Sequence, residues 1–179
     1  MYCLISIQGK YASHYRFKRQ NAQSFKDLIQ GITGSCCTVI SSRFRTDLIY
    51  ISKKLNHRDV LKLWELHLEE ELNQKQRHLF VYKSGKESVL NHYFNSLNKL
   101  CQIHDWYNEY VEEFNYLYSI DQKNPMLKMI DGCDKFLTCH EKANGRTPLV
   151  KNHFQTNNSD DGKIISMLMD VLEKPERYN

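Results

Sequence analysis

Four short runs of apolar and β-branched residues in the first half of the chain predict strands. Residues 2–8 form the first run, which ends at Gly9. Residues 36–42 and 47–53 predict two more strands, and the basic four-residue connection between them favours an antiparallel hairpin. Residues 78–82 predict the fourth strand.

Between these strands, apolar residues recur at the three- and four-residue spacing of helices. Ser24 is suited to start a short helix, and Gly34 is suited to end it. Asn56 is a good N-cap for a second helix over residues 57–74. The first half of the chain therefore alternates strands with two helices.

The second half has only helical periodicity. A capping-box spacing at residues 84–87 opens a helix, and the periodicity continues as one long helix or as two with a break near Asp105. Pro125 fits the first turn of a further helix. Residues 142–160 predict a long polar loop, and residues 164–172 predict a last amphipathic helix.

The order of these elements predicts an α+β fold in two parts. Strand, helix, strand, strand, helix, strand is the βαββαβ order of ferredoxin-like domains, in which two helices cover one face of an antiparallel sheet. We expect this basic domain over residues 1–84 and an α-helical domain or extension over residues 85–179. Because ferredoxin-like domains serve many functions, the function has to be argued from particular residues.

Charge is distributed unevenly along the chain. The 179 residues have a net charge of +4. Residues 1–58 contain ten lysines and arginines against two aspartates, whereas the remaining residues contain 15 basic and 19 acidic side chains. A local excess of positive charge attracts polyanions even in a nearly balanced molecule, so the first third of the chain favours nucleic-acid binding.

Residues 9–19, GKYASHYRFKR, interleave cations with aromatic rings. Cations neutralise phosphates and rings stack on bases, a combination typical of surfaces that bind single-stranded nucleic acid. The same composition also fits a solvated loop whose rings pack on the domain. The residues that we expect to contact RNA or single-stranded DNA are Lys10, Tyr11, Tyr15, Arg16, Phe17, Lys18, Arg19, Arg43 and Arg45.

Two other functions fit parts of the chain. His14 could act as the acid or base of a metal-independent endoribonuclease, although the sequence offers it no second acid-base partner. The helical half could instead be a protein interaction module of an inhibitor, adaptor or effector. The aromatic residues expected to contact such a partner are Trp106, Tyr107, Tyr110 and Tyr116, with Phe114 and Tyr118 beside them.

The sequence gives little support for a metal site or for a cofactor site. Cys101, His104, Cys133 and His140 are candidate zinc ligands, but their spacing matches no common zinc module. Cysteines on apolar helix faces more commonly act as small buried hydrophobes. The chain also lacks a glycine-rich phosphate loop and a dinucleotide fingerprint, so we expect neither a metal nor a cofactor.

Six cysteines, with Cys36 and Cys37 adjacent and the others scattered, favour reduced thiols and a cytoplasmic protein. The N-terminal apolar run is too short for a signal peptide, and no run approaches the roughly 18 apolar residues of a membrane span. We therefore expect no membrane partner. The sequence as a whole predicts a non-enzymatic accessory protein that binds nucleic acid through its basic, aromatic N-terminal loop.

Overall fold

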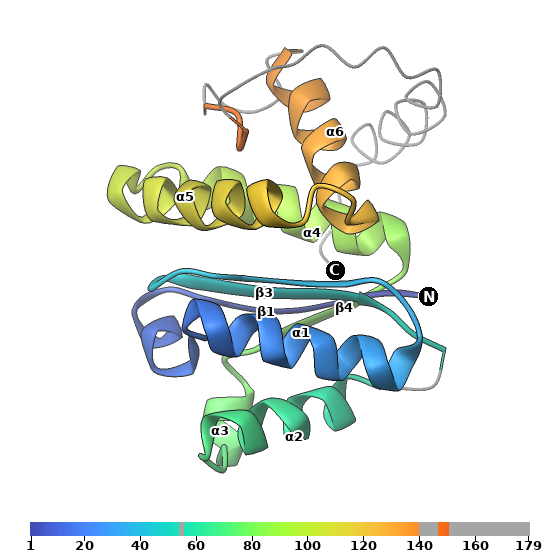
Figure 1. The fold of residues 1–179 in the computed structure, drawn as a ribbon. Helices are drawn as coiled ribbons and strands as arrows, with labels where there is room; N and C mark the ends of the chain where they lie inside the picture. The colour runs from blue at the N-terminus through green and yellow to red at the C-terminus, as the bar shows by residue number, and fades with distance from the viewer. Residues whose placement is uncertain (54–55, 140–146, 151–179) are drawn as a thin grey trace, which may run out of the picture.

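The computed structural model of the chain describes residues 1–53, 56–139 and 147–150. A four-stranded sheet lies between two layers of helices, with α1 and α2 on one face and α4 and α5 on the other (Figure 1). The elements in chain order are β1 (Tyr2–Gln8), the 3-10 helix η1 (Lys10–Tyr15), α1 (Arg19–Thr33), β2 (Cys37–Ser41), β3 (Arg45–Ile51), α2 (His57–Leu68), α3 (Gln74–Arg77), β4 (Val81–Ser84), α4 (Lys86–Leu100), α5 (His104–Ile120) and α6 (Pro125–Cys139).

All neighbouring strands of the sheet are antiparallel, in the order β2-β3-β1-β4. The central pair, β1 and β3, runs from Tyr2 opposite Ile51 to Gln8 opposite Arg45. The α+β class predicted from the sequence is therefore confirmed. Strand β3 begins two residues before the predicted start, so that Arg45 belongs to the strand and not to the connection.

Helix α2 ends at Leu68, six residues before the predicted end. Asn56 caps it as expected, since its side chain accepts hydrogen bonds from the backbone amides of Arg58 and Asp59. Glu69 ends the helix because it adopts a left-handed conformation with φ of 55°. Residues 69–73 of the predicted helix are not helical, and Gln74 begins the short α3, so that β4 starts only at Val81.

Helix α1 begins at Arg19, five residues before the predicted start, and no side chain caps it. Ser24 lies inside the helix, where its hydroxyl donates to the Gln20 carbonyl. The predicted end is confirmed, because Gly34 has the left-handed conformation of a helix C-cap, with φ of 62°.

The two long helices α4 and α5 are separate, with the break at residues 101–103, just before the predicted position. Helix α6 begins at Pro125 as expected. The predicted last helix over residues 164–172 lies outside the described residues, as does most of the predicted loop over residues 142–160. None of the described helices combines the length and apolar character that a membrane crossing requires.

Side chains from the two faces of the sheet fill two hydrophobic cores. Leu4, Ile40 and Ile49 pack with apolar residues of α4, α5 and α6. Ile5 and Leu48 belong to the other core, which they share with large rings of α1 and α2. Since successive side chains of a strand point to opposite faces, this alternation places the helical half of the chain on the second face of the sheet.

Candidate nucleic-acid interface

The predicted nucleic-acid contacts do not all reach the surface. Lys10, Tyr11, Arg16, Lys18, Arg19 and Arg43 are exposed, as predicted contacts must be. Tyr15, Phe17 and Arg45 are only 4%, 3% and 0% exposed. These three residues cannot contact a nucleic acid in this structure, so their assignment to the interface is wrong.

Tyr15 lies on the buried side of η1, and Phe17 lies in the extended segment that follows, where side chains alternate between inward and outward. Tyr15 packs against Phe80, with ring centroids 5.4 Å apart, and its carbonyl accepts a hydrogen bond from the indole of Trp64. Phe17 lies 4.8 Å from the rings of both Phe25 and Trp64. Arg16 and Lys18, at the alternate positions, point toward solvent.

Arg45 is buried because the first residue of β3 directs its side chain toward the second face of the sheet, beneath α4 and α5. Its Nε lies 2.5 Å from a carboxylate oxygen of Asp47, and both side chains are fully inaccessible to water. Burial, the largest single influence, lowers the pKa of Arg45, but the charge of Asp47, the hydrogen bond to it and the neighbouring Tyr110 and Tyr93 together raise it more, so the net shift of this pKa is upward. Arg45 therefore stays charged, and its side chain is bound to Asp47 inside the protein.

Two of the exposed cations are paired with acidic residues of α5. Arg19 contacts Glu113 through two hydrogen bonds of 3.1 Å, and its guanidinium lies 4.1 Å from the ring centre of Tyr116. Arg43 lies 3.4 Å from Glu109, which also accepts a hydrogen bond from the Arg43 backbone amide. Carboxylates of the second half therefore neutralise part of the positive charge of the first third of the chain.

A groove of about 400 Å³ lies beside the first turn of α1. We call it the α1 groove; it is lined by Arg16, Phe17, Lys18, Arg19, Gln20, Asn21, Ser41, Glu109 and Glu113. Within the described residues, neither Arg16 nor Lys18 forms an ion pair. Because no side chain caps α1, the amides of its first turn add partial positive charge to this end of the groove.

The short helix η1 presents three more candidate residues. Lys10 and His14 are exposed, and Tyr11, at 64%, is the most exposed of the described tyrosine, phenylalanine and tryptophan rings. The other face of η1 is anchored in the core by Ala12 and Tyr15. The ring of His14 contacts the ring of Tyr15 edge-on, with centroids 6.3 Å apart. The exposed Lys10 and Tyr11 therefore fit a binding surface better than η1 fits an acid-base site at His14.

The aromatic residues of α5 are used within the protein. Tyr107 and Tyr110 are buried, so their assignment to a partner surface is wrong. The Tyr107 hydroxyl donates to the Thr147 carbonyl. Trp106 stacks on Phe44 with ring centroids 4.1 Å apart. The stacking of Trp106 on Phe44 and the position of Tyr116 under Arg19 attach α5 to the first half of the chain.

The three candidate metal ligands that the structure describes, Cys101, His104 and Cys133, are not gathered into a site. Cys101 donates to the carbonyl of Asn98, and His104 is exposed at the start of α5. Cys133 lies in the core, where burial raises the pKa of its thiol to about 12. His140 lies outside the described residues. In the part of the chain that the structure describes, no three histidine, cysteine or acidic side chains are placed to hold a metal ion.

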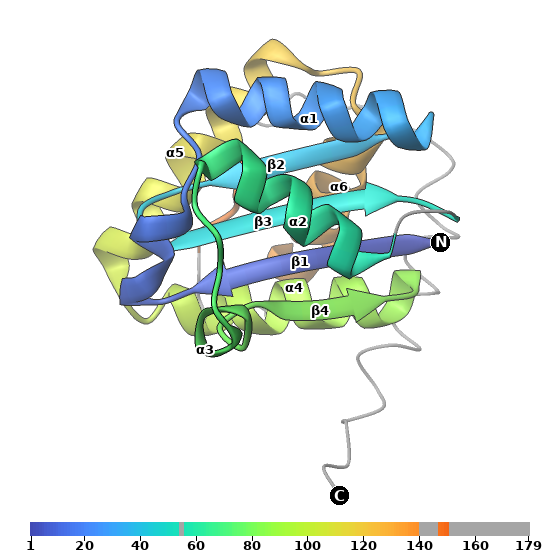
Figure 2. The same ribbon diagram turned by 90° about the horizontal axis from the view of Figure 1, so that it is seen from below.

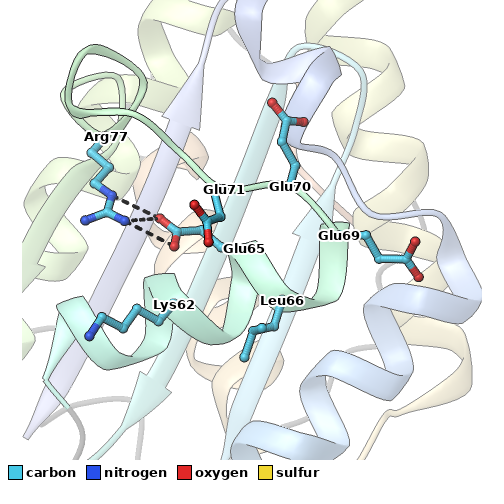
Figure 3. A pocket seen from close by; sticks show the side chains of 7 residues that line it. All are labelled: Lys62, Glu65, Leu66, Glu69, Glu70, Glu71 and Arg77. Carbon is cyan, nitrogen blue, oxygen red and sulfur yellow. Dashed lines mark hydrogen bonds and ion pairs between the residues drawn. The ribbon is translucent and has the colours of Figure 1, made fainter.

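Another groove, of about 590 Å³, follows the C-terminal half of α2 (Figure 3). Arg77 forms an ion pair with Glu65 across it, with a shortest distance of 2.8 Å. The carboxylates of Glu69, Glu70 and Glu71 point in different directions, so they do not converge on a common ligand. These exposed glutamates therefore form a solvated surface.

Comparisons of the chain with protein family models, with curated proteins and with solved structures found no match. The function must therefore be argued from the surface and grooves described above.

Proposed function

We propose that this protein is a non-enzymatic accessory protein that binds single-stranded RNA or DNA at the surface formed by η1 and the α1 groove. The observation that carries the proposal is that Arg16 and Lys18, both exposed, line one groove with the uncapped start of α1. Lys10 and Tyr11 extend this surface along η1. Cations and helix amides bind phosphates, and an exposed ring accepts a base.

The ion pairs at the border limit the proposed surface. Glu109 and Glu113 neutralise Arg43 and Arg19, so the phosphate contacts are assigned to Lys10, Arg16 and Lys18. Three cations and one exposed ring are suited to a short stretch of strand without base specificity. The proposed affinity is consequently modest and strongly dependent on salt.

We also propose that residues 1–84 are a ferredoxin-like domain. The βαββαβ order and the strand order β2-β3-β1-β4 support this assignment. We further propose a cytoplasmic location, which is supported by the six cysteines, all of them free thiols. The helical half would stiffen the sheet of this ferredoxin-like domain by covering its second face.

The test is a pair of charge-matched double variants. R16E/K18E reverses the two unpaired cations of the α1 groove, and K99E/K128E reverses two exposed lysines on α4 and α6. Binding of a fluorescent single-stranded oligonucleotide is measured by anisotropy at about 50 and 200 mM salt. R16E/K18E is expected to bind more weakly and to reduce the salt slope by about 0.7 for each phosphate that it no longer neutralises.

The control variant has the same net charge and should keep the parent slope. Equal binding by the two double variants would remove the α1 groove from the interface. Absence of salt-dependent binding by the parent protein would contradict the proposed function itself.

A further inference from the structure

A third groove, of about 690 Å³, lies between the first turn of α2, the short α3 and β4, on the side of the sheet seen in Figure 2. Its size is within the range of about 300–1,000 Å³ typical of small-molecule sites. The side chains relevant to a ligand are His57, Arg58, Lys62, Arg77, His78 and Tyr82. None of them lines the α1 groove, and we call this the α2 groove.

Two cations of the α2 groove are unpaired within the described residues. Arg58 and Lys62 are exposed and lie four residues apart, so they are neighbours on one side of α2. Arg77, by contrast, is held by Glu65 through hydrogen bonds of 3.0 and 3.2 Å. Arg58 and Lys62 can therefore bind an anion, while Arg77 is held in place by its ion pair with Glu65.

Two rings lie side by side in the same groove. The imidazole of His57 and the phenol ring of Tyr82 have centroids 4.5 Å apart and planes inclined by 39°. His57 is exposed, whereas Tyr82 is half-buried. Because the His57 ring contacts Tyr82 and is itself exposed, a further planar group can be added on its exposed side.

The backbone amides at the start of α2 do not contribute an anion site. The side chain of Asn56 already accepts from the amides of Arg58 and Asp59, at 2.9 and 3.1 Å. An anion in this groove must therefore be bound by the side chains of Arg58, Lys62 and His78. Anion binding in this groove should therefore be sensitive to substitution of these three residues.

We propose that the α2 groove binds a nucleotide, with its base on the His57 and Tyr82 rings and its phosphate between Arg58 and Lys62. Stacking rings beside free cations match the two chemical ends of a nucleotide. The site is separate from the α1 groove and does not depend on the function proposed above. Its ligand is either a free nucleoside phosphate or the phosphorylated 5′ end of a strand.

The experiment measures binding of 5′-AMP to the full chain by calorimetry. R58E/K62E is expected to weaken binding by about tenfold or more, because it replaces two attractive charges with repulsive ones. H57A keeps the cations, and alanine is compatible with the helix, so it tests the ring alone. It is expected to weaken AMP binding by about fivefold and to leave the binding of inorganic phosphate unchanged.

Two charge-matched controls separate this site from the rest of the molecule. K99E/K128E and R16E/K18E should both bind AMP as the parent protein does. Loss of AMP binding in R16E/K18E with retention in R58E/K62E would overturn the proposal, because the nucleotide would then occupy the α1 groove. Equal affinities for AMP and inorganic phosphate would also overturn it.

The source of the nucleotide is decided by competition. If the ligand is a free nucleoside phosphate, an oligonucleotide with a 5′-phosphate will not displace AMP from the α2 groove. If the ligand is a strand end, the 5′-phosphorylated oligonucleotide will displace AMP, and the same oligonucleotide with a 5′-hydroxyl will not. Absence of saturable binding by both AMP and the phosphorylated oligonucleotide would refute the site.

Discussion

Arg45 and Asp47, two residues apart on β3, form an ion pair whose side chains are both completely buried. The other oxygen of Asp47 accepts from the Ser6 hydroxyl at 2.6 Å, and the paired oxygen also accepts from the Tyr110 hydroxyl at 2.5 Å. Arg45 additionally donates to the carbonyl of Tyr93. Burying two charges is expensive, and these hydrogen bonds offset the loss of water. The network joins two strands to α4 and α5.

Replacing Asp47 by asparagine should strongly destabilise the protein. The change leaves the positive charge of Arg45 buried without its counter-ion, which typically costs about 3–5 kcal/mol. Urea unfolding followed by circular dichroism measures the change in free energy. E113Q, which breaks the exposed pair with Arg19, is the control and should cost less than about 1 kcal/mol. Similar unfolding midpoints for D47N and the parent would contradict this account.

Tyr110→Phe should destabilise the protein by about 1–3 kcal/mol, because Asp47 loses a buried donor. Burial and the neighbouring carboxylate raise the pKa of Tyr110 well above its usual value, so the phenol remains protonated and donates. The Tyr93 hydroxyl lies 3.0 Å from it. The double variant Y93F/Y110F should therefore deviate from the sum of the single variants, as chemical denaturation of all three would reveal. Strict additivity would indicate that the two tyrosines act independently.

Stability should fall in acid partly through Asp121, which pairs with the nearly buried Lys26 at 2.5 Å. Burial alone would raise the pKa of this carboxyl, but the hydrogen bonds from Lys26 and Asn124 lower it overall. A carboxyl with a lowered folded pKa stabilises the protein above its unfolded pKa of about 3.9, and this contribution is lost as the pH falls through the folded value.

The stability difference between the parent and D121N is therefore expected to be largest above about pH 5 and to shrink below about pH 4. Thermal unfolding of both proteins across this range measures it. A difference that stays constant down to about pH 2 would exclude Asp121 as a source of acid sensitivity.

Reactivity toward alkylating reagents should separate the six cysteines. Cys139 is exposed and should be modified by iodoacetamide in the native protein. Cys37 and Cys133 are buried, and burial raises the pKa of both thiols, so they should react only after unfolding. Peptide mass spectrometry before and after addition of urea gives the order of modification. Early labelling of Cys133 would show that the core beneath α6 opens readily.

Local signals in the sequence located several element boundaries correctly. Gly34, Asn56 and Pro125 act as predicted because each has a conformational or capping preference that depends on a few neighbours only. The end of α2 was missed, since Glu69 adopts a left-handed conformation that its residue type rarely takes. Such an ending is decided by tertiary packing and not by the local pattern.

The site was harder to predict than the fold. The alternation of Tyr15, Arg16, Phe17 and Lys18 carries the period-two pattern of a half-buried extended segment, which would have separated the core rings from the free cations. The pairing of Arg19 with Glu113 has no comparable signal, because the two residues are 94 positions apart. Only the packing of α5 beside the start of α1 brings their charges together.

Because α4 covers one face of the sheet, the basic first half of the chain is not expected to fold as an isolated fragment. A fragment ending at Ser84 would turn the Arg45 and Asp47 charges, together with the apolar side chains of Leu4 and Ile49, directly into solvent. Such a fragment is expected to aggregate instead of serving as a portable binding module. Whatever the protein recognises, α4 and α5 have to accompany the sheet, because they keep these side chains out of water.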